Sequence, residues 1–281
     1  MREIGQNGII FEGIRPVGLF DVKQFEMQKT RLCHEVFLDA ADEDYVTARY
    51  AWRARLANAF CWSAGQAIEK YTKCALLLNG GSAKFSHDFS SHFKNLQLIC
   101  GNLIADSIEK PEDLDLIEGT KGAFPERTFD AIKRFEENGQ SKQRYREVGH
   151  YVKPYDIHKL DTLCINIRRV CVNLSELRED GLTGKEYLAR NPKTLADYGR
   201  LEKRERRHFP EVKDALLSGN YQFFKEPPEP FPEIWFSWQE SSILSLPVDD
   251  RNYLEALDWL TRNSKMDKEK VRQLLLEVYN K

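Results

Sequence analysis

The stretch from residue 57 to residue 81 reads ANAFCWSAGQAIEKYTKCALLLNGG, and its apolar residues recur at steps of three and four. An α-helix has 3.6 residues per turn, so these steps bring the apolar side chains onto one face. Gly80 and Gly81 come next and favour the left-handed backbone that ends many helices. We therefore expect a long helix that ends before Gly80 and buries Phe60, Ala64, Ala67, Ile68, Tyr71, Cys74, Ala75 and Leu78.

Two further helices are predicted later in the chain. The first begins near SHDF, residues 86–89, where Ser86 or Asp88 can cap the free amides. The second covers residues 156–179, just after Pro154, and its apolar stripe is formed by Ile157, Leu160, Cys164, Ile167, Cys171 and Leu174. With shorter helical pieces between them, the fold class expected is mainly all-α.

The two ends of the chain differ from this central part. Gly and Pro interrupt the first 22 residues, which suits an irregular arm, and helical periodicity starts at Asp44. The C-terminal part combines the charged stretch RLEKRERRH, a proline run that ends in Trp235 and Trp238, and a helical hairpin. The expected domains are an arm over residues 1–43, a bundle over 44–180 and an extension over 181–281.

Composition limits the classes of function. The 42 Lys and Arg against 44 Asp and Glu leave a net charge of −2, so nucleic acid would have to bind to a local patch. The six cysteines are scattered singly, as is typical of reduced, buried thiols. No signal peptide and no apolar run of about 20 residues is present, which predicts a cytoplasmic protein without a membrane span. Without a glycine-rich phosphate loop, no cofactor is expected.

The stretch QRYREVGHYV, residues 143–152, contains the candidate catalytic residues Arg144, Arg146 and His150. A neutral histidine can accept the proton of an RNA 2′-hydroxyl, and the protonated ring can then assist the leaving 5′-oxygen. Arginine binds phosphate with two donors and offsets charge in the transition state. The alternative is a charged turn before Pro154, in which the arginines pair with nearby glutamates.

Four segments in order resemble the HEPN family, whose name stands for higher eukaryotes and prokaryotes nucleotide-binding: DYVTAR (44–49), AGQAIEKYTKCALLLNGG (64–81), SHDF (86–89) and RYREVGHYV (144–152). The resemblance covers about residues 44–178. It implies an up-and-down helical bundle that usually forms a homodimer. It also implies RNA cleavage in toxin or phage-defence systems, or a non-catalytic nucleotide-, RNA- or protein-binding module. A nucleotidyltransferase antitoxin is a common partner in this family.

Family nucleases have an arginine and a histidine separated by four to six residues, and Arg144 and His150 fit with five. Tyr151 follows the histidine, as is common in the family, and is a candidate substrate-binding residue. The residue after the arginine is usually polar, whereas here it is Tyr145, and an RY pair also resembles members that lack nuclease chemistry.

Helix geometry bears on these candidates. A step of six residues turns a helix by about 600°, so Arg144 and His150 would point about 120° apart. A two-fold dimer can still bring them together if its axis passes near this segment. Arg146 lies four residues before His150 and would share its face. Glu69 and Lys73 are either a substrate-binding wall of the same groove or part of a solvated charged face.

Other readings remain open. His87 and Asp88 could belong to a metal phosphohydrolase with His34 and Asp156 or Asp161, although SHDF also suits a helix start, and no metal is expected. The RLEKRERRH stretch could contact phosphates or form a solvated helix. The C-terminal hairpin and tryptophans could instead serve a protein assembly.

Overall fold

The structure is a computed structural model, and it shows helices connected by short turns. It describes residues 20–83, 88–111, 114, 116, 121–139, 152–153, 155–191 and 251–263. The helices are α1 (Val22–Cys33), a π-helical turn (His34–Leu38), α2 (Asp39–Arg53), α3 (Ala57–Leu78), α4 (Phe89–Cys100), α5 (Thr128–Asn138), α6 (Asp156–Arg169), α7 (Gly184–Arg190) and α10 (Arg251–Asn263). The expected all-α fold is confirmed. None of the helices described is long and apolar enough to span a membrane.

Short elements connect some of the helices. Two-residue strands β1 (Ser107–Ile108) and β2 (Glu126–Arg127) pair in antiparallel fashion before α5. Single 3₁₀ turns lie at Gly101–Leu103 and Lys121–Ala123. The β1 and β2 pair brings Glu126 next to the start of α5, and this residue becomes important at the candidate site.

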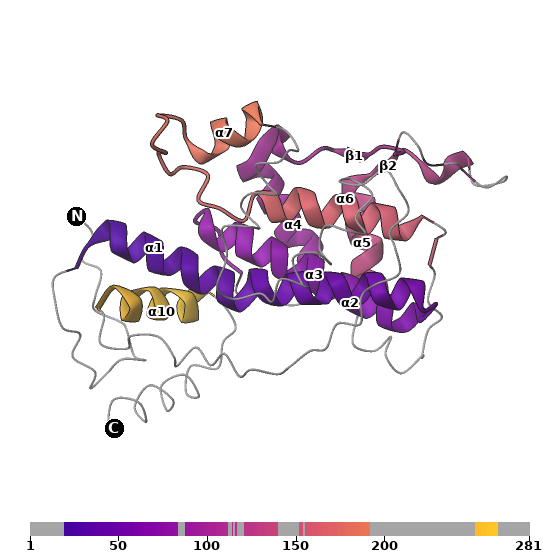
Figure 1. Ribbon diagram of the computed structural model, residues 1–281, viewed down its shortest axis with the longest axis horizontal. Coiled ribbons are helices and arrows are strands. Elements are labelled where there is room, and N and C mark those ends of the chain that lie inside the picture. The colour runs from indigo at the N-terminus through magenta and orange to yellow at the C-terminus, as the bar shows by residue number, and fades with distance from the viewer. Residues whose placement is uncertain are drawn as a thin grey trace, which may run out of the picture.

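Helix α3 lies at the centre of the bundle and packs against α2, α4, α5 and α6 (Figure 1). All eight residues of its predicted apolar stripe are buried, including Phe60, Ile68 and Tyr71. Gly80 has a φ of 77°, the left-handed conformation expected after the helix. The sequence prediction for this helix is therefore confirmed.

The predicted start of the next helix is also confirmed. The Asp88 side chain accepts hydrogen bonds from the Ser91 amide at 3.0 Å and from the Ser91 hydroxyl at 2.7 Å. Asp88 is thus the N-cap of α4, and the hydrogen bonds lower the pKa of its carboxyl. Ser86 lies outside the described residues.

The prediction of an irregular arm over residues 1–43 is wrong from Val22 onward. Asp21 caps α1 by accepting from the Lys23 amide at 2.8 Å, and helical backbone then continues to Arg53. Leu32, Cys33 and Ala41 are fully buried, so this part of the chain belongs to the core. Residues 1–19 lie outside the described residues.

The predicted helix 156–179 ends earlier, at Arg169. Tertiary hydrogen bonds replace the helical ones, because the Asn79 side chain donates to the Val172 carbonyl at 2.9 Å and accepts from the Leu174 amide at 2.8 Å. Cys171 and Leu174 are buried as predicted, but they lie outside the helix. The apolar pattern identified the buried residues and overestimated the helix.

Helix α10 packs along α1, although more than 200 residues separate them in sequence (Figure 1). The Asn252 side chain accepts from the Asp21 amide at 3.1 Å and donates to Gln24 at 2.8 Å. Its predicted apolar residues Tyr253, Leu254, Leu257 and Leu260 are buried in the common core. The predicted extension 181–281 therefore shares a core with the bundle; the second helix of the predicted hairpin lies outside the described residues.

Two buried ion pairs connect α2 to α6. Arg168 donates two hydrogen bonds of 2.8 Å to Asp42, which is fully buried and also accepts from the Tyr71 hydroxyl at 2.6 Å. Asp161 accepts from the Tyr45 hydroxyl at 2.6 Å and lies 3.4 Å from Arg49. These groups satisfy each other, so the charges are tolerated inside an otherwise apolar core. All six cysteines are buried and free, as the sequence predicted.

The crossing of α3 and α5 depends on two glycines. A Cβ at Gly139 would lie 3.0 Å from the Phe135 carbonyl oxygen, 3.1 Å from that of Cys61 and 3.2 Å from the Cα of Gly65. All three are backbone atoms and cannot move aside independently. Gly139→Ala is therefore expected to lower the free energy of unfolding by about 1–3 kcal/mol, measured by urea denaturation.

A matched control is available for this substitution. A Cβ at Gly122 would meet nothing within 4 Å, so Gly122→Ala is expected to change the free energy of unfolding by less than about 0.5 kcal/mol. Equal effects of the two substitutions would contradict the close approach of α3 and α5.

Candidate functional site

The predicted catalytic residues Arg144, Arg146 and His150, and the predicted substrate-binding residue Tyr151, lie outside the described residues. We name the stretch that contains them the 140–151 segment. Both residues that flank it are described: Gly139 precedes it and Val152 follows it. The positions of these two residues show where on the bundle the segment begins and ends.

Gly139, the residue before the segment, lies against the N-terminal half of α3. Gly139 is the C-cap of α5, and its Cα lies close enough to Gly65 and Cys61 that no side chain would fit between them. Phe135, one turn earlier, packs edge-on against Phe60 with the ring centres 6.2 Å apart. Gly139 is therefore held by close backbone contacts with α3, beside the aromatic contact of Phe135.

The segment ends beside a cluster of charges around Glu126. The Lys153 amide donates to the Asp156 carboxylate at 2.8 Å, and the Lys153 side chain donates to Glu126 at 3.2 Å. Glu126 also pairs with Arg134 at 2.8 Å and with the fully buried Lys159 at 2.7 Å. Three cations therefore surround the Glu126 carboxylate, and Lys153 is held to β2 and α6 by these contacts.

This cluster changes the acidity of Glu126. Burial alone would raise the pKa of its carboxyl, but the hydrogen bonds and charges of Lys159 and Arg134 outweigh burial and lower the pKa to about 2. Burial raises the pKa of the neighbouring Asp156, even though Arg134 acts in the opposite direction. Glu126 is therefore the ionised partner of the cluster at neutral pH.

The depressed pKa predicts a pH dependence of stability. A glutamate in an unfolded chain has a pKa of about 4.3, so ionised Glu126 stabilises the fold above that pH. The stabilisation is lost as the pH falls from about 4.3 towards 2, where the folded carboxyl is protonated. The difference in the free energy of unfolding between the wild type and Glu126→Gln, measured by urea denaturation, should be large at pH 7 and should shrink over this range. A constant difference would contradict the role of the charge.

A pocket of about 540 Å³ lies at the turn between α2 and α3, beside the end of the 140–151 segment. We name it the turn pocket. It is lined by Trp52, Arg53, Arg55, Leu56, Ala57, Phe60 and Val152. Val152 is the first described residue after the segment, and Phe60 packs on Phe135 near its start. The turn pocket is therefore lined by the residue that follows the segment.

The side chains around the turn pocket combine aromatic rings with positive charge. Trp52 is half-buried and packs edge-on against Phe60, with the ring centres 4.8 Å apart. Arg53 and Arg55 are exposed, and the lining residues that the structure describes include no carboxylate. Burial and the charge of Arg49 lower the pKa of Arg53, which is the direction expected where positive charges accumulate. Such a pocket suits an anionic ligand with a flat ring.

Arg55 has an unusual backbone conformation. It follows the end of α2 with a φ of 57°, and it is the only non-glycine residue with positive φ in the described part of the chain. The Leu56 amide donates to the Ala51 carbonyl at 2.8 Å, which is the hydrogen bond that commonly closes a helix around a left-handed residue. Glycine is usual there, and another residue costs about 1 kcal/mol or more.

Glu69 and Lys73 lie farther along α3. They form an ion pair of 2.5 Å in which the Glu69 side chain is only 6% exposed. Glu69 is about nine residues from Phe60, or about 14 Å along the helix, and neither residue lines the turn pocket. A solvated charged face does not describe this pair, because Glu69 is buried beneath α4 near His92.

The residues weighed for a metal site have other contacts. A ring nitrogen of His34 lies 2.8 Å from the Cys171 carbonyl oxygen, Asp88 caps α4, and Asp161 binds Tyr45. Within the ranges that the structure describes, no group of three or more His, Cys, Asp or Glu side chains is arranged to bind a metal. His87 lies outside those ranges.

Sequence reasoning missed Trp52, Arg53 and Arg55. The stretch AWRARLANAF around them contains no glycine or proline to indicate that the helix ends there. The available signal was the pair of arginines beside a tryptophan just before the predicted helix 57–79. It identifies a basic aromatic cluster but not the turn that forms the pocket.

One comparison with known proteins gave a match. Residues 34–148 match the model of the HEPN domain. Neither the curated proteins nor the solved structures gave a match to this chain. The matched range contains α2, α3, α4 and α5, and it includes Arg144 and Arg146 but stops two residues before His150. It begins ten residues earlier than the resemblance seen in the sequence. The chain therefore contains a HEPN domain, and its all-α bundle is the fold of that family.

Proposed function

We propose that this protein is a metal-independent endoribonuclease that acts as a homodimer, with Arg144 and His150 as its catalytic residues. The HEPN domain supports the assignment, since family nucleases use an arginine and a histidine at this spacing. The observation that carries it is the position of Val152, the first described residue after the segment. Val152 lines the turn pocket together with two aromatic residues and two arginines.

The length of the segment limits where these residues can act. Twelve residues separate Gly139 from Val152, so the middle of the segment stays within about 20 Å of its fixed ends. That distance includes the turn pocket and its surroundings. An RNA strand that occupies the pocket would therefore be within reach of the candidate residues.

The chemistry follows from the two side chains. Neutral His150 accepts the proton from an RNA 2′-hydroxyl as its oxygen attacks the adjacent phosphorus. The bond from phosphorus to the 5′-oxygen breaks, and a protonated histidine donates the proton to that leaving oxygen. Arg144 stabilises the negative charge on the phosphoryl oxygens. The products are a 2′,3′-cyclic phosphate and a 5′-hydroxyl, and no metal takes part.

A homodimer completes this site. Arg144 and His150 would diverge by about 120° on one helix, whereas a two-fold axis near the segment brings residues of two chains to one groove. Arg146 and Tyr151 are proposed as supporting contacts to the phosphate and base. Glu69 and Lys73, which form a largely buried ion pair on α3, are proposed as further substrate-binding residues. The proposed setting is a toxin or phage-defence system, as in the nucleases that the sequence resembles.

The function is tested by incubating the full chain with single-stranded RNA in EDTA. We expect cleavage that leaves 2′,3′-cyclic phosphate ends, and no cleavage of DNA of the same sequence, because DNA lacks the attacking hydroxyl. Cleavage that requires added Mg²⁺, or that produces 5′-phosphate ends, would contradict the mechanism.

Tyr145 favours a second candidate function. The RY pair also resembles HEPN members without nuclease chemistry, so the alternative is a module that binds RNA, nucleotide or a protein partner through the same surface. RNA binding without cleavage by a folded, dimeric wild type would favour this module over the enzyme.

A further inference from the structure

The turn pocket contains an exposed arginine in a left-handed backbone conformation. Arg55 occupies the left-handed position after α2, where a glycine would be relaxed. Its side chain is exposed, and its guanidinium has no hydrogen bond or ion pair with any residue that the structure describes. Residues held in strained backbone conformations are common at binding sites.

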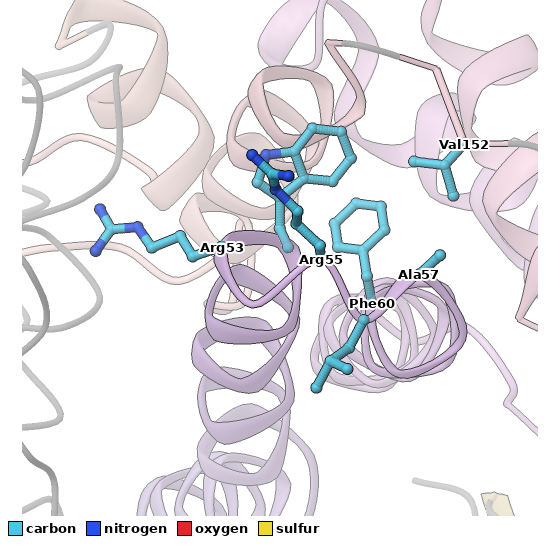
Figure 2. Close-up of a pocket in the computed structure, with 7 residues that line it drawn as sticks. Arg53, Arg55, Ala57, Phe60 and Val152 are labelled. Carbon is cyan, nitrogen blue, oxygen red and sulfur yellow. The ribbon is translucent and has the colours of Figure 1, made fainter.

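The left-handed backbone at position 55 sends the Arg55 side chain in a different direction from that of Arg53. Figure 2 shows the Arg55 side chain on the same side of the turn as the Phe60 ring, whereas the Arg53 side chain extends away from Phe60 and Val152. A helical residue at position 55 would continue the path of α2 and would not make this change of direction. The strain therefore places a free positive charge next to the aromatic wall of the pocket.

The aromatic wall is held in place from behind. Phe60 is buried, packs edge-on against Trp52 and also contacts Phe135. Trp52 itself is only half-buried, so part of its indole remains accessible from the pocket. A fixed tryptophan with an open surface is a good platform for stacking an unpaired base, because every base has a flat π face.

The charges of the lining residues decide between classes of ligand. Arg55 lies on the aromatic side of the pocket, and the lining residues that the structure describes include no carboxylate, which favours an anion over a cation or a basic peptide. The volume of about 540 Å³ is within the usual range for a small-molecule site and exceeds what a lone phosphate needs. A flat apolar wall beside a free guanidinium matches a base and its phosphate together.

We propose that the turn pocket binds one unpaired nucleotide of a single-stranded RNA, with the base stacked on Trp52 and the adjacent phosphate bound by Arg55. The inference deepens the proposed function and rests on it for the identity of the strand as RNA. The next nucleotides of the same strand would then lie beside Val152, which lines the pocket.

The test measures binding separately from cleavage. The probe is a fluorescein-labelled 2′-O-methyl oligoribonucleotide of about eight nucleotides, which has no free 2′-hydroxyl to attack and falls within usual single-strand site sizes. Its binding to the full chain is followed by fluorescence anisotropy at several salt concentrations. Trp52→Leu is expected to weaken binding roughly tenfold or more, and Trp52→Phe is expected to retain most of the affinity.

Arg55 is tested by two substitutions. Arg55→Gly relieves the left-handed strain, so it should keep or raise the melting temperature while it weakens binding and lowers the salt slope by about 0.7, the value for one phosphate. Arg55→Lys keeps the charge and should retain that slope. Arg190→Ala is the control, since Arg190 is an exposed arginine on α7, at the far end of the bundle from the turn (Figure 1), and should bind as the wild type does.

The outcomes separate the pocket from the catalysis. Weakened binding in Trp52→Leu and Arg55→Gly, with Arg190→Ala unchanged, supports the nucleotide site even if the wild type cleaves no RNA. Wild-type affinity in both pocket variants overturns it, even if RNA cleavage is observed. It is also overturned if the wild type does not bind the probe, or if these substitutions change the oligomeric state, because the pocket would then be a contact between copies of the chain.

Discussion

Replacing His150 by alanine is expected to reduce the rate of RNA cleavage in EDTA by about 10²- to 10⁴-fold, the usual contribution of a general acid or base. The imidazole is the only group in the proposed mechanism that both accepts and donates a proton. Its loss should therefore also remove the dependence of the rate on pH near the histidine pKa, about 6.5. Cleavage is measured on labelled RNA at several pH values.

Control substitutions in the same segment distinguish the loss of a catalytic group from the loss of a positive charge. Lys142→Ala removes a positive charge from the 140–151 segment without touching the proposed catalytic residues, and it should reduce cleavage only slightly. Arg146→Ala should have an intermediate effect if Arg146 supports the phosphate. A loss in Lys142→Ala as large as in His150→Ala would contradict a specific role for the imidazole. Melting curves of each variant confirm that the bundle is folded.

Mixing two inactive variants tests whether the site is shared. If Arg144 of one subunit acts with His150 of the other, a heterodimer of Arg144→Ala and His150→Ala retains one intact site of two. Random exchange makes half of the dimers heterodimers, so about a quarter of the wild-type activity should return. No recovery after exchange would place both residues of each site in one chain and would contradict the dimeric site.

The local pattern of the sequence was sufficient to predict the helices at the centre of the bundle. The stripe of α3 repeats over its whole length and is closed by Gly80, so pattern and stop signal agree. The cap of α4 by Asp88 is likewise a contact between near neighbours in sequence. Features that depend on a few adjacent residues were therefore predicted correctly.

Features that depend on residues far apart in the sequence were not predicted correctly. The end of α6 at Arg169 is set by Asn79, which forms hydrogen bonds with Val172 and Leu174 from more than 90 residues away. The helix at residues 22–43 is buried in part by α10, from the other end of the chain. No local pattern encodes these partners, and the predicted irregular arm and the longer helix were wrong for that reason.

The candidate functional residues also divide into those that a local sequence pattern identifies and those that only the fold brings together. Arg144 and His150 were identified from a spacing within one short segment, and that identification remains a prediction. The turn pocket is assembled from the end of α2, the start of α3 and Val152, which are brought together only by the fold. The positive φ of Arg55 has no signal in the sequence, because arginine rarely adopts it.

Replacing Asp42 by alanine is expected to lower the free energy of unfolding by about 3–5 kcal/mol. Asp42 is fully buried and accepts two hydrogen bonds from Arg168 and one from the Tyr71 hydroxyl. Its removal would leave the guanidinium and the hydroxyl without their partner inside the core. The charge of Asp42 also raises the pKa of Arg168, which means that it stabilises the charged guanidinium. The variant lacks this stabilisation. Urea denaturation followed by circular dichroism measures the effect.

Asp44 provides the matched control, two residues along the same helix. It pairs with Lys70 at 2.5 Å, but both side chains are a quarter or more exposed, so water can replace the interaction. Asp44→Ala should therefore cost about 1 kcal/mol or less. The double variant Asp42→Leu with Arg168→Met removes both charges and should recover most of the loss, since the cost arises from the unpaired guanidinium and not from a missing attraction. The prediction would be contradicted if Asp42→Ala and Asp44→Ala lowered the free energy of unfolding by similar amounts, or if the double variant recovered none of the loss. Either result would show that burial does not determine how much the ion pair contributes to stability.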